Sequence, residues 1–325
     1  MIASMKPPFE ITPDIISRIS SISQKIGEAH GFYLNRPSPQ LRKENRIKTI
    51  HSSLHIEGNT LSQEHITAIL ENQRVIGPAK DIREVVNALR VYDQLDALVP
   101  TSEHSFLHAH KMLMEGLVLD AGAYRKGGVG IMRGSSVAHV APPAERVGEL
   151  MRELFAYVRT GRDHVLIKSC VFHYELEFIH PFSDGNGRMG RLWQTALLMK
   201  SFPVFEFLPF ETLIAQRQEG YYRALAASDK AGASTRFIEF MLHILDDALA
   251  DAVRASRPQM NGVDRLDYYT SLGIRTFSRH DYMQVFKHIS SATASRDLAK
   301  GVELGHFEKH GRGNQTTYTV RARPL

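Results

Sequence analysis

One stretch, His180 to Arg191, constrains this chain more than any other, because it places a glycine-containing turn between two apolar helical segments. We expect one helix from Leu166 to Phe178 and another from Arg191 to Lys200. Between them, Gly185 and Gly187 can adopt positive φ, so successive main-chain N–H groups can point toward one position. The start of the second helix adds the positive end of its dipole. The loop is therefore suited to hold phosphate.

The charged side chains of this stretch favour chemistry on a nucleotide. Arg188 and Arg191 are three residues apart, so they share a helix face suited to a di- or triphosphate. Asp184 is a hard oxygen ligand where a phosphate-bound Mg²⁺ would lie. His180 is the group that can accept a proton near neutral pH. The set is suited to attack by a hydroxyl on a nucleotide phosphate, whereas a purely structural turn gives no reason to gather arginines at this end of a helix.

At these residues the chain resembles a known family. The stretch matches the Fic motif, His-Pro-Phe-x-(Asp/Glu)-Gly-Asn-Gly-Arg-x-x-Arg, at every fixed position. Fic proteins mostly transfer AMP from ATP-Mg²⁺ to a Ser, Thr or Tyr hydroxyl of a target protein and release pyrophosphate. The resemblance implies a nucleotidyltransferase that uses ATP and Mg²⁺ and modifies a protein. The related death-on-curing kinases carry Ala and Lys in place of Gly185 and Gly187, which makes phosphorylation a less favoured reading.

The resemblance also implies a role for each residue of the motif. His180 is the general base and Asp184 binds Mg²⁺. Gly185, Asn186 and Gly187 hold the α- and β-phosphates, while Arg188 contacts the β-phosphate and Arg191 the γ-phosphate. Farther along, Tyr221 and Tyr222 are candidates to line an adenine pocket, as tyrosines in this region do in the family. The alternative is that these two tyrosines are core aromatics.

A second helix, from about Gln40 to Glu57, carries a feature of its own at its end. Ser53 and Glu57 are four residues apart and share one face, and Gly58 is typical of a helix C-cap. Glu57 then lies in the last helical turn, where the dipole disfavours a carboxylate and a cationic partner would stabilise it. On spacing alone, a solvated surface glutamate is the alternative.

The resemblance favours a regulatory role for that glutamate. The segment matches the inhibitory motif (Ser/Thr)-x-x-x-Glu-(Gly/Asn) of many Fic proteins. There the glutamate pairs with the second arginine of the catalytic motif, which implies that Glu57 pairs with Arg191 and blocks the γ-phosphate position. The inhibitory helix would span about residues 40–58. Some Fic enzymes instead remove AMP with this glutamate positioning water, so AMP removal is an alternative function.

A β-hairpin is expected at about residues 128–141. Two short β-branched runs are separated by a Gly/Ser turn; they contain Val129, Gly130 and Ile131 in the first run and Val137, Ala138 and His139 in the second. Such a hairpin is only marginally stable alone, so it must lie against the rest of the protein. In Fic proteins the corresponding flap aligns the target segment through backbone hydrogen bonds.

Three histidines on one expected helix, His104, His108 and His110, are interpreted as structural residues. No carboxylate completes a zinc-type site with them, and His110 lies off the face that the other two share. We therefore predict no metal site there.

The C-terminal segment differs in character from the rest. After a linker at 256–262, the pattern predicts a helix from 278 to about 288, a second helix to about 303, and two strands between 307 and 320, as in a winged helix-turn-helix. The expected wing carries four basic residues: Lys309, Arg312, Arg321 and Arg323. Residues 278–323 are a candidate DNA-binding surface, with protein docking as the alternative. A DNA-binding regulator whose Fic part senses nucleotide is a further alternative function.

Composition sets the remaining expectations. With 325 residues the chain can form more than one unit, and a net charge of +5 permits a nucleic-acid or nucleotide partner. Its single cysteine, Cys170, excludes an intramolecular disulfide. No apolar signal or membrane segment is evident, so we expect a cytoplasmic protein with no membrane association; homodimers are common in the resembled family. We predict a mainly α fold, divided into an N-terminal helical region (1–110), a catalytic core with the flap (111–255), and a linker with the winged helix (256–325).

Overall fold

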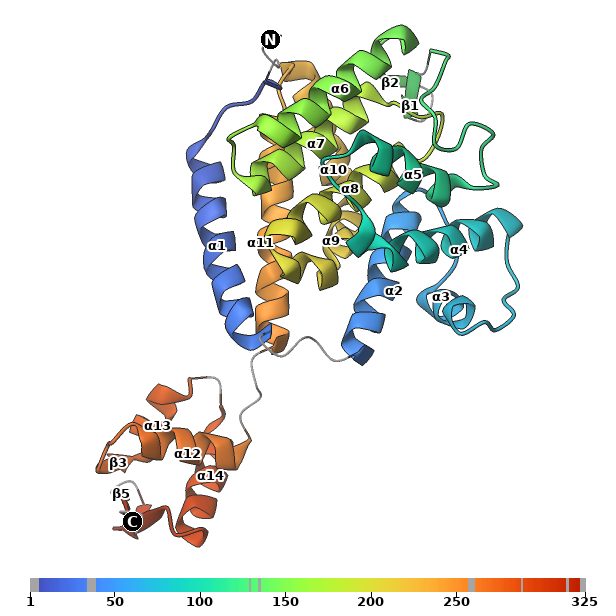
Figure 1. Cartoon of the computed structure of the whole chain (residues 1–325). Helices are drawn as coiled ribbons and strands as arrows, with labels where there is room; N and C mark the ends of the chain where they lie inside the picture. The colour runs from blue at the N-terminus through green and yellow to red at the C-terminus, as the bar shows by residue number, and fades with distance from the viewer. Residues whose placement is uncertain are drawn as a thin grey trace. The chain divides into compact units, whose positions relative to one another are not determined.

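A computed structural model of the chain describes residues 6–33, 39–128, 130–133, 136–256, 261–287, 289–313 and 316–321. The chain divides into two compact units, residues 1–256 and 257–325, each with its own hydrophobic core. The predicted mainly α fold with one hairpin in the larger unit is confirmed (Figure 1). The segments 1–110 and 111–255 contribute to the same core of the first unit.

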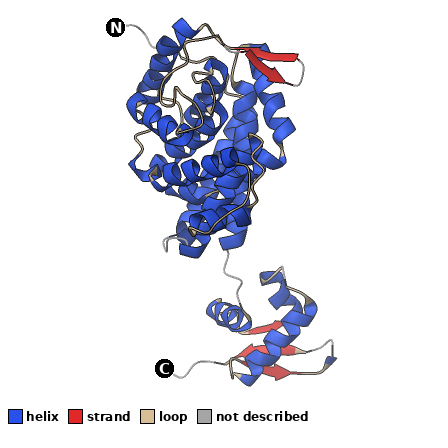
Figure 2. Ribbon diagram, turned by 90° about the vertical axis from the view of Figure 1, so that its right-hand side faces the viewer, coloured by secondary structure: helices blue, strands red, loops and turns tan. Residues whose placement is uncertain are grey.

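The first unit is a helical bundle with one two-stranded sheet (Figure 2). Its α-helices are α1 (Pro13–Tyr33), α2 (Pro39–Ile56), α3 (Gln63–Leu70), α4 (Ala79–Asp93), α5 (Glu103–Met114), α6 (Ala144–Thr160), α7 (Val165–Ile179), α8 (Asn186–Ser201), α9 (Phe210–Gln216), α10 (Gln218–Ala231) and α11 (Thr235–Ser256). Its other elements are the 3-10 helices η1 (Leu95–Ala97) and η2 (Pro203–Phe207) and the strands β1 (Gly130–Arg133) and β2 (Ser136–Val140). The N-terminal helix α1 lies alongside α11, so the start and the end of this unit are packed together (Figure 1).

Helices α7 and α8 form the centre of the bundle. Most residues of both helices are buried, which is why neither sequence shows a polar face. Their close approach requires glycine at Gly190, where a Cβ would lie 2.5 Å from Cδ2 of His173. The loop that joins these two helices is the motif stretch, so the motif is held between two largely buried helices.

Phe182 fixes this loop to the core. Its ring is fully buried and lies 5.4 Å, between centroids, from the ring of Phe106 on α5. Phe106 in turn packs edge-on against Trp193 of α8 at 5.0 Å. Because aromatic side chains bury large apolar areas, the Phe of the motif acts as an anchor for the polar residues on either side of it.

The hairpin has the predicted location. Strands β1 and β2 pair antiparallel, with Gly130 opposite Val140 and Ile131 opposite His139, and the register shifts once between Ile131 and Met132. Val129 lies outside the described residues. The backbone therefore supplies a two-stranded ribbon next to the core, between α5 and α6 in sequence.

The second unit is a small α/β unit. It contains α12 (Gly262–Ser271), β3 (Thr276–Ser278), α13 (Arg279–Val285), α14 (Ser291–Glu303), β4 (Phe307–His310) and β5 (Thr317–Val320). The strands form an antiparallel sheet in the order β3-β5-β4. The order helix, helix, hairpin matches the expectation for residues 278–320, whereas α12 and β3 were not predicted. Helix α13 ends at Val285, earlier than the predicted end near residue 288.

Cys170 lies within the apolar helix α7. Its side chain is fully buried, and burial raises the pKa of the thiol to about 12. Cys170 is therefore a core residue, and its thiol is not poised as a nucleophile. Among the described residues, no helix combines the length and the hydropathy needed to cross a bilayer.

Glu211 at the start of α9 predicts a pH dependence of stability. It is fully buried, and burial raises the pKa of its carboxyl group to about 8. In the unfolded chain the carboxyl group loses its proton near pH 4.5. Its contribution to the free energy of unfolding is therefore fully present below that pH and is lost as the pH rises through 8. We expect Glu211→Gln to raise the melting temperature at pH 8.5 by a few degrees relative to the parent protein, with less effect at pH 5.5.

The fluorescence of Trp193, the single tryptophan, reports unfolding of the first unit. Glu219→Gln is the matched control, because the Glu219 side chain is 92% exposed. An equal effect of the two substitutions at pH 8.5 would contradict the assignment to Glu211.

Candidate active site

The motif loop, residues 180–185, begins with an unusual backbone conformation. His180 follows the last residue of α7 as its C-cap and lies in the left-handed region, with φ 49° and ψ 61°. Its N–H donates to the carbonyl oxygen of Leu176 at 2.9 Å. A non-glycine residue in this region costs on the order of 1–3 kcal/mol, so it persists only where its surroundings hold it. The predicted general base thus lies at a strained point of the chain, with its side chain half-buried.

Asn186 braces the loop from inside. Its Oδ1 accepts from the N–H of Phe182 and its Nδ2 donates to the carbonyl oxygen of Phe182, both at 3.0 Å. The residue is 2% exposed. The sequence predicts Asn186 as a phosphate ligand; with its amide side chain closing the loop, the group that remains for a phosphate is its main-chain N–H at the start of α8.

The two glycines of the motif meet different needs. Gly185 has φ 89° and serves as the N-cap of α8 without a side chain that would occupy the first N–H groups of the helix. At Gly187, a Cβ would lie 2.4 Å from Oε1 of Glu57. The first glycine makes the turn and keeps the helix N-terminus open to an anion, and the second allows Glu57 to approach the helix.

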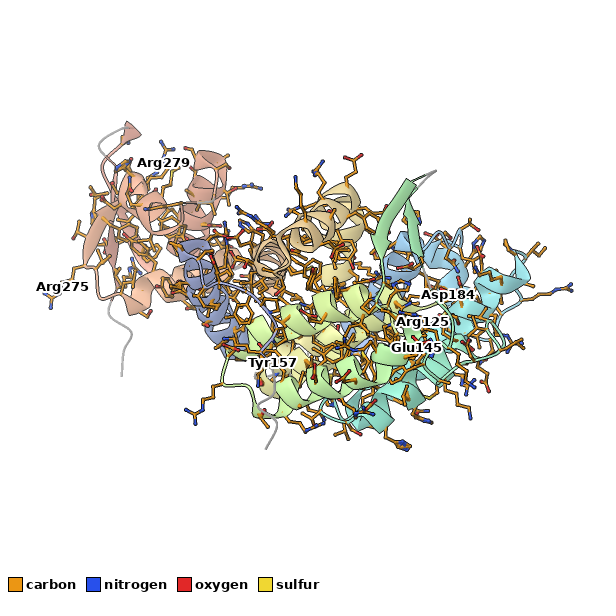
Figure 3. The ribbon with its side chains drawn as sticks, turned by 90° about the horizontal axis from the view of Figure 1, so that it is seen from above. Arg125, Glu145, Tyr157, Asp184, Arg275 and Arg279 are labelled. Atoms are coloured by element: carbon orange, nitrogen blue, oxygen red, sulfur yellow. The ribbon has the colours of Figure 1, made fainter. Side chains whose placement is uncertain are left out.

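Arg188 is buried between two carboxylates. Its Nη2 donates to Oδ1 of Asp184 and its Nη1 to Oε1 of Glu84 on α4, both at 2.8 Å. Glu84 is itself held by Asn59, whose Nδ2 donates to Oε2 at 2.8 Å. These contacts fix the guanidinium while the side chain of Asp184 remains 45% exposed at the loop surface (Figure 3).

Arg191 is fully buried and contacts the end of α2. Its Nε donates to Oγ of Ser53 at 3.0 Å, and its Nη2 donates to the carbonyl oxygen of Ser53 at 2.9 Å and to Oε1 of Glu57 at 2.8 Å. Burial opposes the charge, but the Glu57 carboxylate leaves the pKa of the guanidinium raised. Gly58 has φ 90°, the left-handed conformation of a helix C-cap. The turn places the Glu57 side chain against Arg191.

A second carboxylate, Glu177 of α7, lies near the same arginine. The Cβ position at Gly187 is 3.3 Å from Oε1 of Glu177 and 3.1 Å from Nη1 of Arg191. Burial, followed by the neighbouring Glu57, raises the pKa of Glu177 to about 7. The hydroxyl of Tyr221 lies 3.2 Å from Oε1 of Glu177.

The two candidate adenine-pocket tyrosines differ in burial. Tyr221 is 1% exposed and its hydroxyl also lies 3.0 Å from Nε2 of His173. Its ring is thus packed as a core aromatic, the alternative considered from the sequence. Tyr222 is half-buried and lines a surface pocket with Gln218 and Glu219. Of the pair, Tyr222 has the surface with which to meet a ligand.

His110 of α5 supports the motif loop, a role that the sequence did not reveal. Its ring stacks on Phe182, with centroids 3.5 Å apart. Its Nδ1 accepts from the N–H of Gly122 at 2.9 Å, so the other ring nitrogen carries the proton and donates to the carbonyl oxygen of Asp184 at 3.0 Å. Burial lowers the pKa of His110 to about 4, so it remains neutral and structural.

Comparison with known proteins identifies the family. The family model described as Fic/DOC matches residues 100–198. A crystal structure of a Fic family protein from Desulfovibrio desulfuricans G20 is 41% identical, with a TM-score of 0.75, and the match covers 98% of this chain and 99% of that chain. The chain belongs to the Fic family. The family expected from the motif is therefore confirmed.

Curated relatives of this Fic protein carry names that describe an activity. Protein adenylyltransferase Fic of Nematostella vectensis is 31% identical over 181 residues, which is 51% of this chain and 41% of the relative. Protein adenylyltransferase fic-1 of Caenorhabditis elegans is 30% identical over 187 residues, or 53% of this chain and 35% of the relative. The matches thus span less than half the length of these relatives.

The structure brings together the motif residues and the end of α2 in this Fic chain, and it adds three residues whose contacts with the motif sequence reasoning missed. They are Glu84 beside Arg188, His110 beneath the loop, and Arg125, whose guanidinium contacts the carbonyl oxygen of His180 at 2.7 Å. All three lie far from the motif in sequence, so only their spatial contacts distinguish them from ordinary helix and loop residues.

Proposed function

We propose that this Fic protein transfers AMP from ATP to a Ser, Thr or Tyr hydroxyl of a target protein. One observation carries the proposal: a histidine, an open helix N-terminus and two buried arginines lie together at one place in the first unit. A helix N-terminus binds anionic phosphate through its N–H groups and dipole, and arginines extend such a site along a polyphosphate. The names of the curated relatives agree with this activity.

In the proposed reaction, the target hydroxyl loses its proton to His180 while its oxygen attacks the α-phosphorus of ATP. The bond from the α-phosphorus to the bridging oxygen breaks, and pyrophosphate leaves. The main-chain N–H groups at the start of α8, around residues 185–187, stabilise the negative charge on the phosphates. Arg188 and Arg191 hold the β- and γ-phosphates so that pyrophosphate departs in line.

The residues present fit a bound Mg²⁺. Among the described residues, no three His, Cys, Asp or Glu side chains gather as a self-sufficient metal site. Mg²⁺ with a nucleotide needs only one or two carboxylates, since phosphate oxygens and water complete its coordination. The part-exposed Asp184 carboxylate beside the helix N-terminus would hold the ion, which would supply charge neutralisation for the phosphates.

We further propose that Glu57 inhibits the reaction. Its carboxylate contacts Nη2 of Arg191 at 2.8 Å, so it would occupy the position that the γ-phosphate takes beside this guanidinium. ATP would then bind with its phosphates misplaced for attack. The hairpin β1–β2 would act as the flap that receives the target segment through main-chain hydrogen bonds.

Transfer from ATP labelled at one phosphate tests the function. Purified Glu57→Gly protein is incubated with Mg²⁺, a cell lysate, and ATP carrying label at either the α- or the γ-phosphate. AMP transfer predicts protein labelled from the α-position only. Label from the γ-position would instead indicate a kinase. If the protein mainly removes AMP, the parent protein strips a labelled target and Glu57→Gly loses that activity.

A basic groove on the second unit favours DNA as a further partner. Arg279 and Lys309 line it together with hydroxyl groups of Ser291, Ser295 and Thr316. Cations and hydroxyls are the side chains that contact phosphates of duplex DNA. The acidic residue Asp297 on α14 does not oppose this reading, because it is 6% exposed and pairs inward with Arg265 at 2.7 Å.

We expect the double substitution Arg279→Ala/Lys309→Ala to weaken binding of the full chain to duplex DNA and to reduce the salt dependence, as the slope of log K against log salt, by about 2. Arg275→Ala is the matched control. Arg275 is exposed, and its side chain points away from the unit at a place separate from Arg279 (Figure 3). Fluorescence anisotropy over a series of salt concentrations measures both quantities. If the parent chain does not bind duplex DNA at low salt, the DNA proposal is wrong and a protein partner is favoured instead.

A further inference from the structure

We propose that Arg125 is a positioning residue that fixes the hairpin and the backbone of His180 relative to each other. This inference rests on the proposed AMP transfer, because it assigns Arg125 the task of aligning the base with a hydroxyl held at the flap. Arg125 lies between α5 and the hairpin and is 4% exposed. Figure 3 shows it in the same region of the first unit as Asp184.

One side of Arg125 holds three successive carbonyl groups of the motif region. Its Nε donates to the carbonyl oxygen of His180 at 2.7 Å, and its Nη2 donates to that of Ile179 at 3.2 Å. The main-chain N–H of Arg125 donates to the carbonyl oxygen of Pro181 at 2.9 Å. These acceptors flank and include the residue with positive φ, so Arg125 holds the strained turn on both sides.

The other side of the guanidinium holds the two ends of the hairpin. Its Nη1 donates to the carbonyl oxygen of Gly127 at 2.7 Å, and its Nη2 donates to that of Pro142 at 2.6 Å. Gly127 precedes β1 and Pro142 follows β2. A single side chain therefore joins both stems of the hairpin to the motif loop.

The charge of Arg125 suits this location. All guanidinium acceptors found in the described part of the chain are main-chain carbonyls. Two of them, at Ile179 and His180, belong to the C-terminal end of α7. The last carbonyls of a helix lack partners within the helix and carry its negative dipole, which stabilises a cation there. Burial lowers the pKa of Arg125, while Glu145 at the start of α6 acts in the opposite direction.

Only arginine can make this set of contacts. A guanidinium presents five donors in a planar fork, so it can reach carbonyls on opposite sides at once. A lysine ammonium is a point donor and would contact one side or the other. Arg125→Lys is therefore the informative substitution, because it keeps the charge and removes the bridge.

The consequence for catalysis follows from distance. Strand addition at the flap fixes the position of the target segment. The proton acceptor must then lie within hydrogen-bond distance of the hydroxyl group on that segment. If the hairpin and the loop move independently, that alignment is lost while the phosphate site, formed by residues 185–191, remains intact. A misplacement of about 1 Å can lower a rate roughly 100-fold.

The test measures kinetics and hydrogen exchange in the Glu57→Gly protein. Adding Arg125→Lys or Arg125→Gln is expected to lower kcat for AMP transfer by at least tenfold with KM for ATP within twofold. Amide exchange is expected to accelerate in segments 125–128 and 179–183. Arg159→Lys is the matched control, because Arg159 is exposed and its Nη1 donates to the carbonyl oxygen of Thr101 at 3.2 Å, outside the site.

Two other outcomes overturn the inference. Unchanged kcat together with unchanged exchange would show that the bridge positions nothing. A variant that exposes Trp193 at all temperatures would show that Arg125 supports the whole unit rather than the site. If Glu57→Gly alone attaches no AMP to protein, the proposed function fails, and the exchange of the two segments decides separately whether Arg125 couples them.

Discussion

Glu57→Gly is expected to raise AMP transfer by about 10- to 100-fold over the parent protein. The substitution removes the carboxylate that contacts Arg191 at 2.8 Å, so the buried guanidinium becomes available to a γ-phosphate. A hydrogen bond between charged groups contributes about 1.5–3 kcal/mol, and each 1.4 kcal/mol corresponds to about a factor of ten. Initial rates of α-label incorporation at saturating ATP-Mg²⁺ measure the effect.

The control for Glu57→Gly is Glu44→Gly. Glu44 lies on α2, the helix that ends just before Glu57; it is exposed, and its carboxylate accepts a hydrogen bond from Gln40 on the same helix. Glycine there loosens α2 without touching Arg191. If the two substitutions activated the protein equally, activation would reflect a loosened helix, and the specific block by the Glu57 carboxylate would be wrong.

His180→Ala in the Glu57→Gly protein is expected to lower the rate of AMP transfer by about 10²–10⁴-fold, the range typical of general-base catalysis. Binding of ATP should change little, because the groups proposed to hold the phosphates belong to the start of α8 and not to the imidazole. Label incorporation gives the rate, and calorimetry with ATP-Mg²⁺ gives the affinity.

His108→Ala is the matched control for this experiment, since His108 is exposed on α5. It should retain the activity of Glu57→Gly. If His180→Ala were about as active as this control, the His180 imidazole would not act as the general base. A loss of ATP affinity equal to the loss of rate would assign His180 to binding instead of proton transfer.

Local sequence signals were sufficient to predict much of the fold and the proposed site. The two glycines and the arginines of the motif lie within one turn and one helix start, so their arrangement follows from nearby residues. Gly58 ends α2 in the left-handed conformation, as a C-cap glycine does, and the same turn directs Glu57. The hairpin followed from two β-branched runs across a Gly/Ser turn.

Contacts between segments that are distant in the sequence could not be predicted. Arg188 and Glu84 are 104 residues apart, and Arg125 and His180 are 55 apart, so no periodicity connects them. Helix α12 was missed for a different reason: its start at Gly262 resembles a continuation of the linker. The side chain of Asn261 in fact accepts from the N–H of Asp264 in a capping box, a local signal that the glycine obscured.

The nature of the released product tests the central claim most directly. Glu57→Gly protein is incubated with ATP, Mg²⁺ and a lysate, and the products are separated by chromatography. Protein AMP transfer predicts one pyrophosphate released for each AMP attached to protein, and loss of both when His180→Ala is added. Release of ADP with a phosphoryl group on protein would contradict AMP transfer, and so would pyrophosphate without AMP on any protein.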